Sequence, residues 1–311
     1  MSGNIMRQAG RAALAAALAL VAGGLACNLP GAQPPTPTPE PPPPAETAAP
    51  PEETAEEPAV TEETAETEEP AATEATAEPP AASPMGAGVV CENLSFNLNP
   101  SVAAGVVGEV VPAEDAGPEG PYFATYPAHA ECLLTGYALS DRFHEPRLYA
   151  WPVAEYAAMN PGAAEVIARM ETFLVERPAA PESVPFLPFW GAAQMMQAKV
   201  SYLDFQNGTG VRFLTQYGQA ANPINNNEMF YTFQGMTDDG VYWLGAVLPV
   251  SHPSLPADGM DVPGGDWAAF SETYEVYITG IEATLNGLAD DSFTPSLAAL
   301  DALVRSVMAG P

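Results

Sequence analysis

The chain has 311 residues, of which 39 are acidic and nine are basic, so its formal net charge at pH 7 is −30. This surplus of negative charge repels phosphate backbones, and nucleic acid is therefore excluded as a partner. After residue 26 no apolar stretch reaches the ~20 residues that a membrane-spanning helix needs. We therefore expect no such helix in the mature protein.

Residues 1–26 have the layout of a signal peptide: two arginines, then an apolar run, then small residues before Cys27. The segment Gly24-Leu25-Ala26-Cys27 resembles the lipobox of bacterial lipoproteins, although Gly24 stands where leucine is common. This resemblance covers only the leader. It implies that Cys27 becomes an acylated (palmitate-type) N-terminus, which anchors the protein to the extracytoplasmic side of a bacterial membrane, at the cell surface or facing the periplasm. The alternative is an ordinary cleaved leader with an incidental cysteine.

Residues 27–88 are dominated by Pro, Ala, Thr and Glu. The prolines are densest from Pro34 to Pro44, and thirteen glutamates are distributed over the whole stretch. Such a chain cannot bury enough apolar surface to offset the entropy of ordering, so we predict a disordered acidic tether. The tether would hold the following domain away from the membrane; a binding site for a partner is the alternative.

Two cysteines remain after Cys27, namely Cys91 and Cys132. In an oxidising compartment, two cysteines most simply form one disulfide. The bridge would enclose about 40 residues and stabilise the fold by roughly 3–4 kcal/mol. Free buried thiols are the alternative.

Residues 89–311 have the composition of one globular extracytoplasmic domain, with seven Lys or Arg against 26 Asp or Glu, a net of −19. Apolar patterning and turn residues predict seven strands and three helices. In chain order these are strands over 95–98, 131–139 and 147–153, a helix beginning at Asn160-Pro161, strands over 197–206, 211–217, 228–236 and 241–250, a helix over 270–285, and a helix beginning at Thr294-Pro295.

The strands over 228–236 and 241–250 are apolar on both faces, which is typical of a sheet covered on both faces. The sequence therefore predicts an α+β fold, in which an antiparallel sheet of hairpins is covered by helices on both faces. Its element order from residue 131 to residue 308 is similar to that of the PsbP-like fold, which also occurs in bacterial lipoproteins. This resemblance is one of topology, and it implies a non-enzymatic envelope module.

The loop from Ser251 to Asp266 is the most unusual segment of the domain, because it is long and has no periodic pattern. Asp258, Asp261 and Asp266 could converge there as oxygen ligands of Ca²⁺, which prefers several carboxylates on a bendable loop. The spacing matches no EF-hand. The alternative is a solvated loop in which Asp266 caps the next helix.

No nucleophile, phosphate-loop or dinucleotide motif occurs in the sequence. The leading hypothesis is therefore a tethered, non-catalytic module that binds a protein, a glycan or a small ligand. One such site could combine Asn225-Asn226-Asn227 with the aromatic faces of Tyr217, Tyr231 or Trp243. The alternatives are a surface hydrolase, with or without a metal ion, that uses His252 together with the Asp258/Asp261 loop, and a purely structural wall-associated protein.

Overall fold

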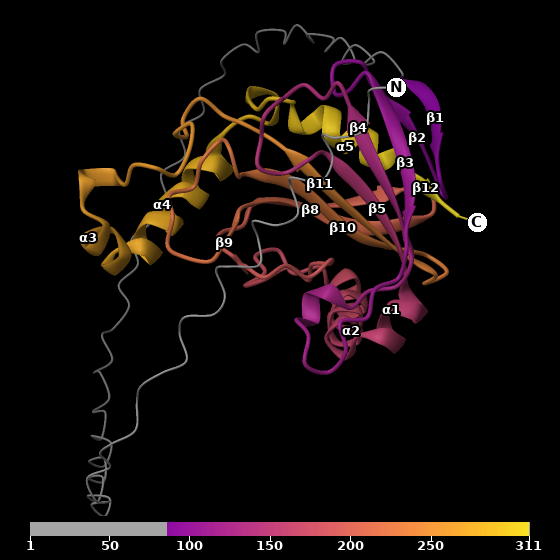
Figure 1. Ribbon diagram of the computed structural model, residues 1–311. Helices are drawn as coiled ribbons and strands as arrows, with labels where there is room; N and C mark the ends of the chain where they lie inside the picture. The colour runs from indigo at the N-terminus through magenta and orange to yellow at the C-terminus, as the bar shows by residue number, and fades with distance from the viewer. Residues whose placement is uncertain (1–85, 311) are drawn as a thin grey trace, which may run out of the picture. The chain divides into compact units, whose positions relative to one another are not determined.

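The computed structural model describes residues 86–310, whose helices and strands are arranged as in Figure 1. The predicted leader, Cys27 and all but the last residues of the predicted tether lie outside the described residues. Residues 86–310 belong to one compact unit, and their mixture of helices and antiparallel sheets confirms the predicted α+β class. Between residues 86 and 310, no helix is long and apolar enough to cross a membrane.

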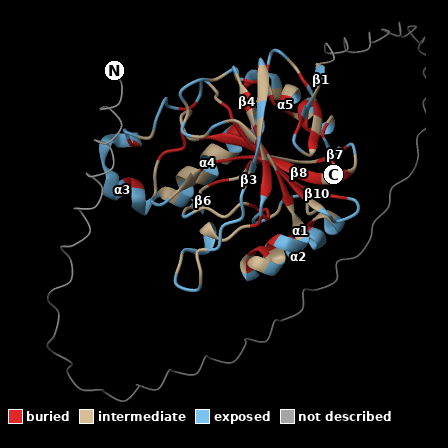
Figure 2. Cartoon of the chain, turned by 45° about the vertical axis from the view of Figure 1, so that its right-hand side comes forward, coloured by how far each residue is buried: buried red, intermediate tan, exposed pale blue. Residues whose placement is uncertain are grey.

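A seven-stranded antiparallel sheet forms the centre of the domain, with the strand order β3-β4-β5-β11-β10-β8-β7. Its central strands are buried, as the red ribbons of Figure 2 show, and every residue of β10 is buried, as its apolar faces predict. The strands are β3 (Gly105–Val111), β4 (His129–Thr135), β5 (Arg147–Pro152), β7 (Ala198–Phe205), β8 (Gly208–Thr215), β10 (Phe230–Thr237) and β11 (Tyr242–Pro249).

Two smaller sheets flank the central one. The first joins β1 (Ala87–Cys91), β2 (Leu94–Leu98) and β12 (Met308–Ala309), and the second pairs β6 (Ala193–Gln194) with β9 (Tyr217–Gly218). The predicted disulfide is confirmed: Cys91 at the end of β1 is bonded to Cys132 on β4, with an S–S distance of 2.02 Å.

Sequence patterning missed strands β1 and β3. Strand β3 lies at the edge of the central sheet, where Val107 and Val110 are exposed although they are apolar. The strand therefore lacks the alternation of buried apolar and exposed polar residues by which strands are recognised.

The helices are α1 (Val153–Met159), α2 (Pro161–Glu176), α3 (Trp267–Glu272), α4 (Tyr274–Gly287) and α5 (Leu297–Arg305), with 3₁₀ turns η1 (Tyr122–Ala124), η2 (Pro263–Gly265) and η3 (Asp290–Ser292). The prediction that Asn160 caps α2 is confirmed, because its Oδ1 accepts hydrogen bonds from the N–H groups of Gly162 (3.0 Å) and Ala163 (3.2 Å). The prediction that Thr294-Pro295 begins the last helix is wrong by two residues, since Ser296 caps α5.

The turn between β7 and β8 is tighter than the four-residue turn that the sequence indicates. Phe205 is paired with Gly208, so only two residues lie between the strands and the glycines belong to β8. A Cβ atom on Gly208 would lie 2.2 Å from the Phe205 ring, and one on Gly210 would lie 2.4 Å from the Phe233 ring. These glycines are required by close packing of aromatic rings rather than by the turn.

The buried side chains form two clusters on opposite faces of the central sheet. Along β11, Trp243 and Val247 belong to one cluster, whereas Leu244 and Leu248 belong to the other. Alternate residues of a strand point to opposite faces, so this division separates the clusters across the sheet. We call them the α2 cluster and the α5 cluster, after the helix that contributes most to each.

Candidate functional site: an aromatic groove

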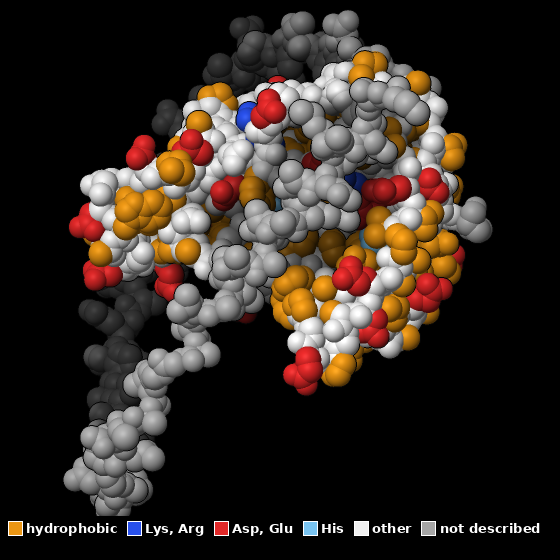
Figure 3. All heavy atoms as spheres, in the orientation of Figure 1, with side chains coloured by type: hydrophobic (Ala, Val, Ile, Leu, Met, Phe, Trp, Pro, Cys, Tyr) orange, Lys and Arg blue, Asp and Glu red, His pale blue; other side chains and the backbone are white. Residues whose placement is uncertain are grey.

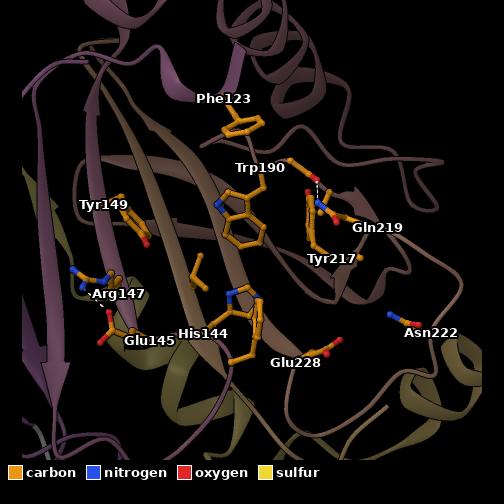
Figure 4. Close-up of a pocket in the computed structure, with 15 residues that line it drawn as sticks. Phe123, His144, Glu145, Arg147, Tyr149, Trp190, Tyr217, Gln219, Asn222 and Glu228 are labelled. Carbon is orange, nitrogen blue, oxygen red and sulfur yellow. Dashed lines mark hydrogen bonds and ion pairs between the residues drawn. The ribbon is translucent and has the colours of Figure 1, made fainter. Parts of the chain in front are cut away.

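An open cavity of about 840 Å³ lies over β5, β9 and the loops next to them (Figure 4). A second hollow of about 500 Å³ shares four of its lining residues, so the two hollows adjoin, and we call them together the aromatic groove. The larger hollow is lined by the aromatic side chains of Phe123, Phe143, Tyr149, Trp190 and Tyr217 and by the polar ones of His144, Glu145, Arg147, Gln219, Asn222 and Glu228. The smaller hollow adds Tyr122.

Trp190 stands in the middle of the groove and comes from the proline-rich segment between α2 and β6. Gln234 fastens this segment to the sheet, because its Oε1 accepts hydrogen bonds from the Leu187 N–H (3.1 Å) and from the Trp243 indole (2.8 Å). The Gln219 side chain donates to the carbonyl of Gly191 at 2.8 Å. These hydrogen bonds hold the backbone segment that carries Trp190 in place, and they thereby fix the position of its indole.

His144 lies flat against Trp190, with ring centroids 5.0 Å apart and planes 16° from parallel. Its loop is fixed by a 2.9 Å hydrogen bond from the Phe143 N–H to the carbonyl of Asn227. Burial lowers the pKa of His144 to about 4, so the ring is neutral at pH 7. Its Nε2 atom is buried and has no hydrogen-bond partner among the described residues.

The one arginine of the groove is neutralised by its neighbours. Arg147 donates to Glu131 and to Glu145 at 2.7 Å each and lies 3.5 Å from Glu109. Glu228 contributes a further carboxylate, which accepts a 3.0 Å hydrogen bond from Gln216. The groove is therefore negative overall, like the face in Figure 3, where acidic side chains are spread widely and basic ones are scarce.

The three aspartates of the predicted calcium site have separate roles or none. Asp266 caps α3 by accepting from the N–H groups of Ala268 and Ala269, which was the alternative expected for it. Asp258 accepts from the N–H of Met260. Within residues 86–310, no three His, Cys, Asp or Glu side chains form a group that could hold a metal ion, so Asp258, Asp261 and Asp266 are not brought together. Calcium binding stays a prediction.

In the triplet Asn225-Asn226-Asn227, the first two side-chain amides form hydrogen bonds within the protein and are not free to bind a ligand. Asn225 is fully buried, and its Oδ1 accepts from the N–H groups of Asn227 and Glu228. Asn226 exchanges hydrogen bonds with the backbone of His252. Tyr231 and Trp243 are also fully buried. Of the side chains proposed around the triplet, only Tyr217 lines the groove.

His252, the residue of the hydrolase hypothesis, lies elsewhere. Its Nδ1 is 2.8 Å from the hydroxyl of Ser254, and its ring packs on Phe293 with centroids 5.0 Å apart. It does not line the groove.

Sequence reasoning missed Trp190, His144 and Tyr149 as members of a site. One signal was present: Phe186-Leu187-Pro188-Phe189-Trp190 places three aromatic residues in a segment whose prolines exclude a regular helix or central strand. Aromatic residues in such a loop have no periodic reason to be there, which makes them candidates for a surface that contacts a ligand.

The half-buried, neutral ring of His144 predicts a specific dependence of stability on pH. Its pKa is about 4 in the folded chain and ~6.5 in the unfolded one, so only the unfolded state gains this proton as the pH falls through that window. The free energy of unfolding is therefore not reduced by this group above pH ~6.5, and it decreases by on the order of 2–3 kcal/mol towards pH 4. In urea unfolding at pH 4.5 and 7, His144→Gln should lose less stability on acidification than the parent; equal losses would contradict the assignment.

Comparison with known proteins gives no further guide to this site. No protein-family model matches the chain, and no curated protein or solved structure matches it.

Proposed function

We propose that this protein is a lipid-anchored, non-catalytic binding module of the bacterial envelope, and that the aromatic groove binds a neutral glycan. The observation that carries the proposal is the composition of one open hollow, which is lined by five aromatic side chains together with carboxylates and amides. Aromatic faces supply apolar contact area, and the polar groups between them fix orientation and give specificity.

The shape and chemistry of a sugar chain suit these walls. A sugar ring has an apolar face that can lie on Trp190 or Tyr217 and a rim of hydroxyls that both donate and accept hydrogen bonds. Glu145 and Glu228 can only accept when ionised, whereas the amides of Gln219 and Asn222 can do both. The two adjoining hollows, of about 840 and 500 Å³, offer room for more than one sugar ring.

The charged side chains of the groove favour a neutral ligand over an anionic one. Arg147 is already engaged by carboxylates, and His144 is neutral at pH 7. Glu228 adds a further carboxylate to the same hollow, so a phosphate or uronate would meet uncompensated negative charge. A neutral ligand avoids this repulsion.

We infer further that helices cover both faces of the central sheet. Ile167, Met170 and Phe173 of α2 are part of the α2 cluster, and Leu300 and Val304 of α5 are part of the α5 cluster, which supports this inference. Tyr149, Trp190 and Tyr217, which line the groove, pack against the α2 cluster, so the groove lies on the face of the sheet that carries this cluster.

Anchoring through Cys27 would place the groove outside the cytoplasm, where envelope glycans are found. Incorporation of a fatty-acid analogue that is lost in Cys27→Ser would support the anchor, and labelling that survives the substitution would contradict it.

Replacing Trp190 by alanine should weaken glycan binding at least tenfold, because the central stacking face is lost. The measurement is calorimetric titration with a panel of neutral oligosaccharides. The matched control is Trp267→Ala: this indole lies on α3, is 45% exposed, and does not line the groove. Equal affinity of the Trp190 variant and the control would reject the groove as the site. The absence of binding to any neutral oligosaccharide would reject the glycan.

A further inference from the structure

We propose that the outer edge of strand β3 is a second binding surface, onto which an extended peptide of a partner protein adds as a further strand of the central sheet. The peptide that fits this edge alternates apolar and basic residues. No residue of β3 lines the aromatic groove, so this surface is distinct from the glycan site and does not depend on it. Three features of the edge point to such a partner: its open backbone, its valine side chains and the carboxylates around it.

The two end strands of the central sheet differ in how their backbone is paired. At β7 the edge is closed by helix α4, because the N–H of Lys199 donates to the side chain of Asn286 at 2.6 Å. The pairing of β7 is also irregular, with a register shift between Ala198 and Ser201. At β3, within residues 86–310, the backbone forms no backbone hydrogen bond outside its ladder with β4. Every other residue of β3 therefore presents its N–H and C=O groups away from the sheet, as an added strand requires.

Strand β3 has none of the features by which edge strands avoid pairing. Such strands are commonly short, or they carry a proline, a lysine or a bulge. Strand β3 spans seven residues, pairs with β4 without a register shift, and reads Gly-Val-Val-Gly-Glu-Val-Val. Val107 and Val110 are each 59% exposed, and Figure 2 shows the strand in the colours of intermediate and exposed residues. A regular, exposed and valine-rich edge is suited to strand addition.

The two faces of β3 differ, and this difference defines the alternation of the partner. Val106 packs against the α5 cluster, and Val110 shares its face because alternate residues of a strand point the same way. Glu109 lies on the opposite face, 3.5 Å from Arg147. A strand paired with β3 therefore places apolar side chains beside Val110 and basic ones beside Glu109. The aliphatic stem of a lysine can also cover Val107, which lies on the face of Glu109.

The charge around the edge favours a basic peptide over a second copy of the domain. The side chain of Glu109 is 62% exposed, and its one cationic neighbour, Arg147, is closer to two other carboxylates. Glu92 lies over the other face, with its carboxylate 3.1 Å from where a Cβ atom on Gly108 would be. Two copies paired along β3 would bring these carboxylates together, in domains that each carry a net charge of −19. A basic peptide is attracted by the same groups.

The test is a titration of the whole chain, at physiological ionic strength, with a labelled eight-residue peptide of alternating lysine and valine, followed by fluorescence anisotropy. Val110→Lys places a positive charge on the edge, and we expect it to weaken binding by on the order of tenfold. The matched control is Val276→Lys, because Val276 is 76% exposed on α4 and has no part in the edge. It should retain the parent affinity. Glu109→Gln, which removes one attractive charge, should weaken binding by about threefold. Equal affinity of the two lysine variants would overturn the proposal.

Two further measurements separate strand addition from attraction to an acidic surface in general. A peptide of the same composition, with its lysines and valines in two blocks, should bind on the order of tenfold more weakly, because it cannot match the two faces. Hydrogen exchange should slow over residues 105–111 when the alternating peptide binds and should not change over β7. Equal binding of the two peptides, or protection that does not include β3, would overturn the proposal. Sedimentation of the chain without peptide should show a monomer; a dimer that Val110→Lys dissociates would assign the edge to a second copy instead.

Discussion

Replacing Arg212 with alanine should lower the free energy of unfolding by about 3 kcal/mol. This is the lower end of the cost of breaking a buried ion pair, because Arg212 is buried whereas its two carboxylate partners are partly exposed. Arg212 is only 5% exposed and lies on β8. Its guanidinium contacts Asp290 at 2.7 Å and Asp301 at 3.4 Å, and it donates to the carbonyl of Lys199 at 2.8 Å. These contacts join the β7–β8 edge of the sheet to the C-terminal helical region.

Loss of this side chain leaves the Asp301 carboxylate without its cationic partner. Burial raises the pKa of Asp301, while attraction to Arg212 and a hydrogen bond from Tyr231 (3.0 Å) oppose the rise. A carboxyl whose folded pKa is raised stabilises the fold at low pH, and this contribution is lost as the pH rises through the folded pKa. Without Arg212 the pKa of Asp301 rises further, so the loss of stability should be smaller at pH 4 than at pH 7.

Urea unfolding at both pH values tests this expectation. The matched control is Arg177→Ala, because Arg177 is 47% exposed and its contact with Asp204 is 3.4 Å long. An exposed pair of this kind contributes about 1 kcal/mol or less. Similar losses for the two arginine variants, or a loss for Arg212→Ala that does not change with pH, would contradict the buried network as described.

Removing the disulfide by Cys91→Ala together with Cys132→Ala should lower the free energy of unfolding by about 4 kcal/mol. The two cysteines are 41 positions apart, and closing a loop of that length in the unfolded chain accounts for this magnitude in the chain-entropy model. Both residues are buried, and alanine leaves no unpaired polar group behind.

The measurement is the urea midpoint with and without a reducing agent. Reductant should destabilise the parent towards the value of the double variant and should leave the double variant unchanged. The bridge as a stabilising link between β1 and β4 would be contradicted by either of two results. One is a urea midpoint of the parent that does not change when reductant is present during unfolding, and the other is a double variant as stable as the parent.

The sequence predicted the parts of the fold whose signals are local. The β10–β11 hairpin is framed by apolar runs and by Asp238-Asp239-Gly240, where Gly240 has a φ of +70° that favours glycine. Asn160-Pro161 likewise combines a cap with a residue suited to the first turn of a helix. In both cases the determinants lie within a few residues of each other, so pattern and structure agree.

The groove could not be predicted in this way, because its walls come from segments far apart in the chain. Arg147 and Tyr149 precede Trp190 by about 40 positions, and Tyr217 and Glu228 follow it by about 30. The sequence did select Tyr217, but it paired this ring with Asn225-Asn226-Asn227, whose first amide is taken up by its own loop. Which polar groups a loop uses for itself is decided by tertiary contacts.

The pairing of β5 with β11 has a consequence for the order in which the molecule assembles. Strands β7, β8, β10 and β11 pair with near neighbours in the chain, whereas β5 is separated from β11 by about 90 residues. Pairings between distant segments form slowly, because chain entropy must be lost before any contact compensates it. The β3-β4-β5 half should therefore dock last, and a newly synthesised chain would have no intact groove until that final step.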